Sequence, residues 1–83
     1  MNSHKMIVVS WDANNKLVET TYLITVGDVL LDTACKDRAV VTSIEKTKYG
    51  VVFNFDLGGQ LEAAWLDPRL ANGEFLHFPK KVA

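Results

Sequence analysis

Cysteine is scarce in this sequence, with Cys35 the only one among 83 residues. A single thiol cannot form an intramolecular disulfide, and it cannot provide the cluster of cysteines that holds structural zinc. The two histidines, His4 and His77, are far apart in the chain and have no carboxylate or thiol at metal-ligand spacing. We therefore expect no disulfides, no metal and no other cofactor, and we expect a reducing compartment, the cytoplasm.

Neither sign of charge is in excess. Nine basic residues stand against ten acidic ones, for a formal charge of -1. The chain thus has no overall field that attracts phosphates, so a nucleic-acid partner would require a local basic patch. No apolar run reaches the roughly 18 residues that cross a bilayer, and the first residues, MNSHKMIVVSW, lack the long apolar segment of a signal peptide. We expect no membrane partner.

The chain is short but rich in apolar residues. A domain of this size buries only roughly 60 to 65 % of the surface of its unfolded chain, yet 48 % of the residues are hydrophobic. A second copy is a simple cover for surplus apolar surface. We therefore expect residues 1–83 to form one domain that self-associates as a dimer or larger homo-oligomer.

Alternating and β-branched residues predict an N-terminal hairpin over residues 6–24. Its first strand is MIVVS, and Asp12 to Asn15 provide turn residues that tolerate left-handed backbone conformations. The second strand is KLVETTYLITV, in which neither face is cleanly polar. We therefore expect both faces of this hairpin to be partly covered.

A strand meander is predicted over residues 26–70, followed by a last strand over residues 74–79. Gly27-Asp28 interrupts the pattern and is interpreted as a structural joint. The strands after it are VLL, AVVTSIEK, VVFNFD and LEAAWL, with tight turns at Tyr49-Gly50 and Gly58-Gly59. LEAAWL is also compatible with a helix, but six residues are too few for a stable one, so we expect a strand.

The alternation in VVFNFD places Val51, Phe53 and Phe55 on one face, and the LEAAWL strand would place Trp65 opposite them in the core. DPRL suits a 3₁₀ turn near residues 68–70. Together these segments predict an all-β fold, a small barrel or roll of about five to seven short antiparallel strands.

At the level of pattern, residues 26–70 resemble the Src-homology-3-like small β-barrels, the broad group that includes Tudor-type and KOW-type modules. The resemblance lies in the Val26-Gly27-Asp28-Val29 entry, the irregular loop and meander that follow, and the exit turn DPRL. It implies a small barrel fold. No ligand-binding residue is carried over from it. The loop DTACKDR lacks an aromatic residue for a Tudor-type cage, and Arg38-Ala39 stands where the second strand of a KOW-type module usually opens with a glycine.

Other ionisable groups give no catalytic pattern. Lys36 can lower the pKa of the adjacent Cys35 thiol, but no histidine is near it in sequence, so we expect a free, partly buried and unreactive thiol. Asp28, Asp32 and Asp37 do not have the spacing of a calcium loop and are interpreted as solvated loop charges. His77 alternates with apolar neighbours and is expected to face solvent or an interface. No catalytic residue is predicted.

Aromatic residues in excess of the expected core are the best functional indication. The candidate binding residues are Trp11, Tyr22, Tyr49, Phe75, Lys46 and Lys48. Aromatic side chains at interfaces contribute much of the binding energy, which favours a non-enzymatic binding or adaptor module with a protein partner. Its small size is common among accessory or mobile-element proteins, and we expect this chain to be one of them.

Two alternatives remain open. Lysines interleaved with aromatics, including Lys80-Lys81, fit a nucleic-acid-binding barrel, and an oligomer could build a ligand-binding or enzymatic site between its subunits.

Overall fold

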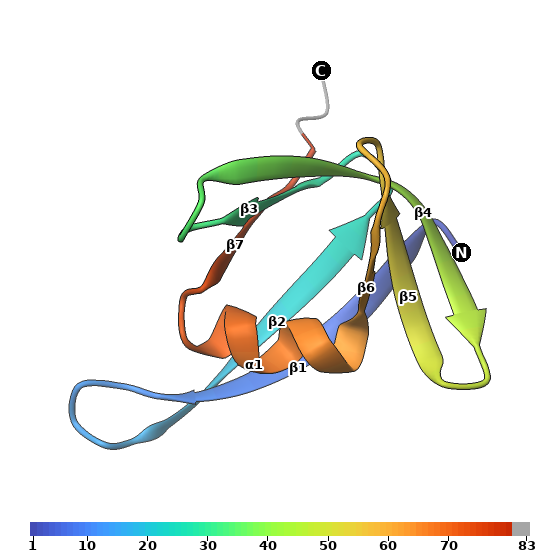
Figure 1. Ribbon diagram of the computed structural model, residues 1–83. Coiled ribbons are helices and arrows are strands. Elements are labelled where there is room, and N and C mark those ends of the chain that lie inside the picture. The colour runs from blue at the N-terminus through green and yellow to red at the C-terminus, as the bar shows by residue number, and fades with distance from the viewer. Residues whose placement is uncertain (81–83) are drawn as a thin grey trace.

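Two antiparallel sheets and one short helix make up the computed structural model, which describes residues 1–80 (Figure 1). The elements in chain order are β1 (Ser3–Trp11), β2 (Leu17–Thr25), β3 (Val29–Asp32), β4 (Asp37–Thr47), β5 (Gly50–Phe55), β6 (Gln60–Glu62), α1 (Ala63–Ala71) and β7 (Phe75–Phe78). The prediction of a predominantly β fold with antiparallel strands is confirmed, but the sheets do not close into a barrel.

The first sheet is the predicted hairpin of β1 and β2, which is longer than expected. Nine residues of β1 pair with nine of β2, from Ser3 opposite Thr25 to Trp11 opposite Leu17. Asn15 takes a left-handed conformation with φ of 58° in the turn, and Asp12 Oδ1 accepts backbone hydrogen bonds from Asn14 and Lys16. The polar turn sequence therefore fixes the register of the hairpin.

The second sheet has the strand order β6-β5-β4-β3-β7. Each neighbour is antiparallel, and the long strand β4 changes register against β5 between Val41 and Ser43. Such an irregularity bends a strand, and it allows β4 to pair with β3 at one end and with β5 at the other. The last strand, β7, returns beside β3, the first strand of this sheet.

The core lies between the hairpin, the five-stranded sheet and α1. Its members are apolar side chains from all of these elements: Met6, Val8, Ile24, Leu30, Val41, Ile44, Phe53, Phe55, Ala63, Leu66 and Leu70. Phe53 and Phe55 are buried as predicted. Phe53, Leu66 and Ile24 are fully inaccessible, so strands and helix share one hydrophobic centre.

The strand expected over residues 61–66 is wrong beyond Glu62. The chain enters α1 at Ala63, and the 3₁₀ turn expected near residues 68–70 is the second half of this α-helix. Ala63, Leu66 and Leu70 are buried at helical spacing, so packing on the core stabilises a helix too short to be stable alone. Pro68 lies inside the helix and costs it one backbone hydrogen bond.

This change of element moves Trp65 out of the core. On a strand its side chain would lie on the same face as Leu61 and Ala63, whereas on α1 it points away from Ala63 and Leu66 and is 39 % exposed. The core position expected for Trp65 is therefore wrong. Leu66 occupies the buried position instead.

Candidate interaction surface

The most prominent feature of the molecular surface is an apolar face on the β1–β2 hairpin. Alternate residues of the two strands point to the same side, and their pairing sets four rungs across the hairpin. We call this the arm face and define it by its four paired rungs: Lys5 with Leu23, Ile7 with Thr21, Val9 with Glu19, and Trp11 with Leu17.

The large apolar side chains of the arm face are all well exposed. The exposed fractions are 54 % for Ile7, 48 % for Val9, 67 % for Trp11, 61 % for Leu17 and 56 % for Leu23. Together they present roughly 600 Å² of apolar surface, which reaches the upper end of the largest patch on an ordinary monomer. The opposite face of the hairpin contributes Met6, Val8 and Ile24 to the core.

The end of the hairpin extends beyond the rest of the molecule (Figure 1). Every residue from 11 to 21 is exposed, including Val18 on the face opposite the arm face. A two-stranded hairpin without cover on either face is marginally stable in water. The expectation that both faces of the hairpin would be partly covered is therefore wrong: at its base one face packs on the core while the arm face is exposed, and at its end both faces are exposed.

The structure does not gather the predicted binding residues into one site. Trp11 lies on the arm face, while Tyr49 is 76 % exposed at the turn between β4 and β5, at the other end of the molecule (Figure 1). Lys48 Nζ lies 5.0 Å from the centroid of the Tyr49 ring, and Lys46 is exposed nearby on β4. The cation already covers one face of the Tyr49 ring.

Tyr22 and Phe75 are partly buried and pack against the core. The Tyr22 ring meets the His77 ring edge-on at 6.0 Å, and the Phe75 ring meets the Trp65 ring edge-on at 5.6 Å. Both aromatics therefore already have partners within the fold. Of the predicted lysine pair at residues 80–81, Lys81 lies outside the described residues.

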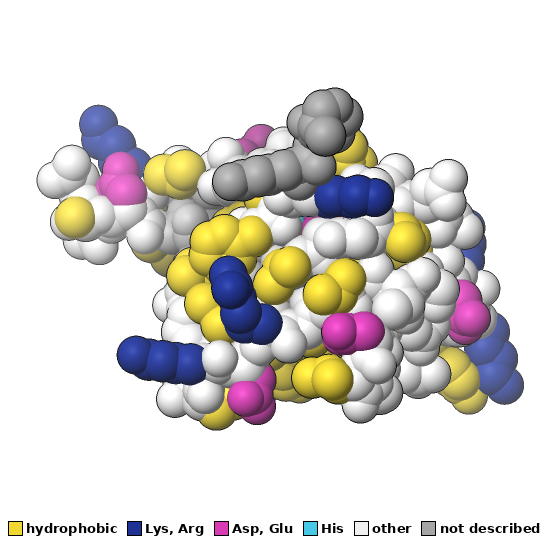
Figure 2. All heavy atoms as spheres, turned by 90° about the horizontal axis from the view of Figure 1, so that it is seen from above, with side chains coloured by type: hydrophobic (Ala, Val, Ile, Leu, Met, Phe, Trp, Pro, Cys, Tyr) yellow, Lys and Arg dark blue, Asp and Glu magenta, His cyan; other side chains and the backbone are white. Residues whose placement is uncertain are grey.

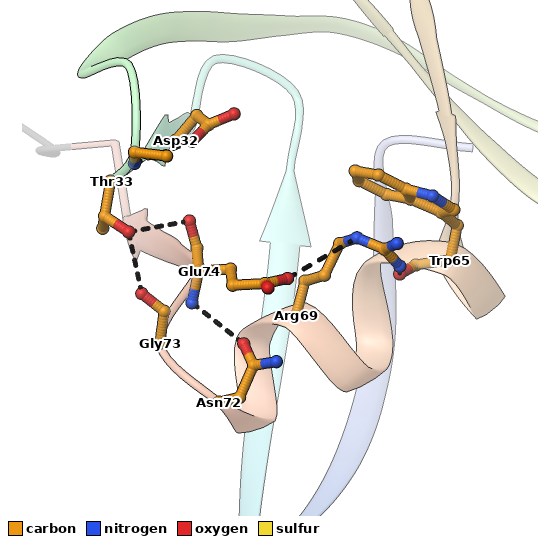
Figure 3. A network of polar contacts seen from close by, with 8 residues as sticks. Asp32, Thr33, Trp65, Arg69, Asn72, Gly73 and Glu74 are labelled. Atoms are coloured by element: carbon orange, nitrogen blue, oxygen red, sulfur yellow. Dashed lines mark hydrogen bonds and ion pairs between the residues drawn. The ribbon is translucent and has the colours of Figure 1, made fainter.

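A cluster of side chains around α1 was not predicted from the sequence, because residues 61–66 were expected to form a strand. The guanidinium carbon of Arg69 lies 3.7 Å from the Trp65 ring centroid, and Arg69 donates a 2.8 Å hydrogen bond to the Trp65 carbonyl (Figure 3). Arg69 Nε also lies 3.6 Å from Glu74 Oε2. The four-residue spacing of Trp65 and Arg69 was the available signal, since it aligns them on a helix.

A second apolar area lies on the outer face of β3, β4 and β7, where apolar and basic side chains gather (Figure 2). Leu76 and Phe78 are 42 % and 41 % exposed there. The Arg38 guanidinium lies 5.9 Å from the centroid of the Phe78 ring. This area is less exposed than the arm face and is partly covered by its own arginine.

The predictions for Asp28 and His77 as solvent-facing groups are wrong, because the two form a buried pair. Nε2 of His77 donates to Asp28 Oδ2 over 2.8 Å, and the side chains are 7 % and 3 % exposed. Asp28 Oδ2 also accepts the Thr25 amide at 2.8 Å, and Oδ1 accepts the Lys80 amide at 2.7 Å. The carboxylate thus ties the end of β2 to β7 and to the segment after it.

Burial opposes ionisation of Asp28, but the hydrogen bonds from His77, Lys80 and Thr25 outweigh it and lower the pKa of this carboxyl below 3.8. A shallow hollow of about 410 Å³ opens beside the pair and is lined in part by Tyr22, Leu23 and Pro79. Both carboxylate oxygens are already bonded within the chain. The geometry identifies Gly27-Asp28 as the structural joint predicted from the sequence.

Cys35 is exposed, so the expectation of a partly buried thiol is wrong. A hydrogen bond from the Asp37 backbone favours the thiolate, but desolvation and the carboxyl groups of Asp37 and Asp32 outweigh it and raise the pKa of the Cys35 thiol. A thiol with a raised pKa is a weak nucleophile at neutral pH. The low reactivity expected of Cys35 from the sequence stays a prediction.

Comparison with known proteins gives no relative for this chain: no family model, curated protein or solved structure matches it. Within residues 1–80, no helix has the length and apolar character needed to cross a membrane. In the same part of the chain, no three or more His, Cys, Asp or Glu side chains come together as a possible metal site.

Proposed function

We propose that this chain is a non-enzymatic adaptor module that acts through protein–protein contacts, with the arm face as its contact surface. The observation that carries the proposal is the set of five large apolar side chains exposed on one face of a projecting hairpin. Soluble domains rarely leave such an area uncovered unless it binds another molecule.

The composition of the arm face suits a protein partner. Trp11 lies beside aliphatic side chains, and aromatic anchors surrounded by apolar contacts are typical of the residues that dominate interface energies. Lys5 and Glu19 are its charged residues and have opposite signs, so the face has no net charge to attract phosphates. The partner surface is therefore expected to be apolar and close to neutral.

The resemblance of residues 26–70 to the Src-homology-3-like barrels remains a prediction about the fold alone. The antiparallel strands β3 to β6, followed directly by a helical segment, support it. The arm face lies outside residues 26–70. The binding surface proposed here is therefore independent of that resemblance.

Site-specific photocross-linking tests the proposal. Benzoylphenylalanine at position 17 would place a reactive group on the arm face, and the same residue at position 57, where Leu57 is 80 % exposed, is the matched control. In cells that express the chain we expect covalent protein adducts from position 17 and none from position 57. Adding Val9→Glu should abolish the adduct, because it places a charge in the apolar face.

The Val9→Glu result distinguishes specific contact from accidental collision. An adduct that persists with Val9→Glu, or no adduct at position 17 at any expression level, would show that the arm face is not a protein contact surface. The far-ultraviolet circular dichroism of each variant should match that of the unmodified chain, because the replaced side chains are exposed.

A further inference from the structure

We infer that the partner of the arm face is a second copy of this chain, packed face to face about a two-fold axis. This inference rests on the proposed function, because it identifies the occupant of the same surface. A two-fold contact places a surface patch against itself, so the patch must be complementary to its own inverted copy. The pairing of β1 with β2 allows this requirement to be checked residue by residue.

The area of the arm face is close to what a stable dimer requires. Its five large apolar side chains alone expose roughly 600 Å², against the ~800 Å² that each partner contributes to a standard interface. Face-to-face packing of two sheets is an established way of covering such surfaces. One additional copy therefore provides enough cover without any other component.

The four rungs of the arm face lie over complementary rungs when the second copy is rotated by 180° about the two-fold axis. A two-fold axis that crosses the strands between the second and third rungs lays the Ile7–Thr21 rung over the Val9–Glu19 rung of the other copy. Ile7 then meets Val9, an apolar contact, while the Thr21 hydroxyl can donate to the Glu19 carboxylate. Each of these contacts occurs twice by symmetry.

The outer rungs match in the same arrangement. The Lys5–Leu23 rung of one copy lies over the Trp11–Leu17 rung of the other. Leu23 meets Leu17, and the Lys5 ammonium comes within reach of the Trp11 indole face, a favourable cation–π geometry. Lys5 of one copy therefore does not face Lys5 of the other copy, and the two Glu19 side chains do not face each other.

The second apolar area, around Leu76 and Phe78, is less suited to contact a second copy of itself. Arg38 already lies over the Phe78 ring, so each copy would bring a guanidinium group into any contact made through that area. Like charges brought together across an interface oppose association. The arm face is therefore the surface that suits a second copy.

A pair of charged variants tests both the partner and the register. Ile7→Lys and Val9→Glu should each lower the mass of the species in solution from twice 9.3 kDa, the dimer, to 9.3 kDa, the monomer. The reason is that each variant homodimer would bury two charges against apolar side chains. Mixed one to one, they should recover the doubled mass, since Lys at position 7 then meets Glu at position 9. Sedimentation equilibrium measures all three masses.

Two controls complete the design. A mixture of Ile7→Lys with Ile7→Glu should stay at 9.3 kDa, because these charges do not meet in the proposed register. Trp11→Ala should raise the dimer dissociation constant by roughly 30-fold or more, whereas Tyr49→Ala, at a somewhat more exposed aromatic outside the arm face, should leave it unchanged.

An unmodified chain that remains at 9.3 kDa up to its solubility limit would overturn the second-copy inference. The proposed function would then still stand if position 17 gave a Val9-dependent adduct with a different protein. A doubled mass that the complementary mixture fails to restore would overturn the face-to-face register. Circular dichroism of each variant verifies that the changes act on association rather than on folding.

Discussion

Replacing Asp28 with asparagine should lower the free energy of unfolding by about 2 to 4 kcal/mol. The carboxylate accepts three hydrogen bonds, from the Thr25 amide, the His77 ring and the Lys80 amide, at 2.7 to 2.8 Å. Asparagine has the same size but only one acceptor oxygen. Its amide nitrogen would face either the donors at Oδ2 or the donor at Oδ1, so at least one of these donors loses its partner.

Urea unfolding followed by far-ultraviolet circular dichroism measures this loss. His77→Gln is the matched control, because a glutamine amide can still donate to Asp28, and we expect it to cost less, about 1 kcal/mol. An Asp28→Asn variant that stayed within about 0.5 kcal/mol of the unmodified chain, the ordinary range of surface substitutions, would show that these three hydrogen bonds do not stabilise the fold.

The acid limb of the stability profile gives a second measurement on the same residue. The native pKa of Asp28 is lowered from its ordinary value of 3.8, so the unfolded chain binds more protons near that pH. The stabilisation is therefore fully present above pH 3.8 and is lost as the pH falls through the lowered native pKa. Asp28→Asn should flatten this part of the profile, and an unchanged slope would contradict the assignment.

Three further perturbations have expected outcomes. Gly27→Val should destabilise the fold by at least about 1 to 2 kcal/mol in urea unfolding, because Gly27 has φ of +98° and its Cβ would lie 2.7 Å from Lys80 Cδ; Gly58→Val, with φ of +84° and no neighbour within 4 Å, isolates the backbone strain. Equal losses for the two glycines would exclude the steric contribution. Leu66→Ala should cost about 2 to 5 kcal/mol by the same assay, since the side chain is fully buried, and a loss below about 1 kcal/mol would contradict its place in the core. Cys35 should react with iodoacetamide at pH 7 more slowly than a free cysteine in a peptide, because its pKa is raised, and faster reaction would show an activated thiol.

The sequence determined the features that depend on local pattern. Alternating side chains predicted the hairpin strands and the Phe53 and Phe55 face, and the Asp12 to Asn15 turn has the left-handed residue expected of asparagine. Gly27 and Asp28 were identified as a joint because a glycine followed by a short acidic side chain permits an unusual backbone and bonds to nearby amides. These properties act within a few residues and need no knowledge of distant contacts.

Packing decided the secondary structure of the segment from Leu61 to Leu70, which has apolar residues at both strand and helix spacing. The buried positions Ala63, Leu66 and Leu70 are available only when α1 docks on the core, and that choice exposes Trp65 and brings it to Arg69. Propensity could not settle the question, because a nine-residue helix owes its stability to tertiary contacts.

The candidate site could likewise be predicted only in part from the sequence. Sequence pattern identified Trp11 and Tyr49 as aromatics beyond the expected core, and both are well exposed. Only the tertiary structure decided which face of the hairpin packs on α1 and which stays uncovered, because both faces contain apolar residues. It also buried His77 against Asp28, two groups 49 residues apart, since a hydrogen bond across that separation depends on how β7 returns to the sheet.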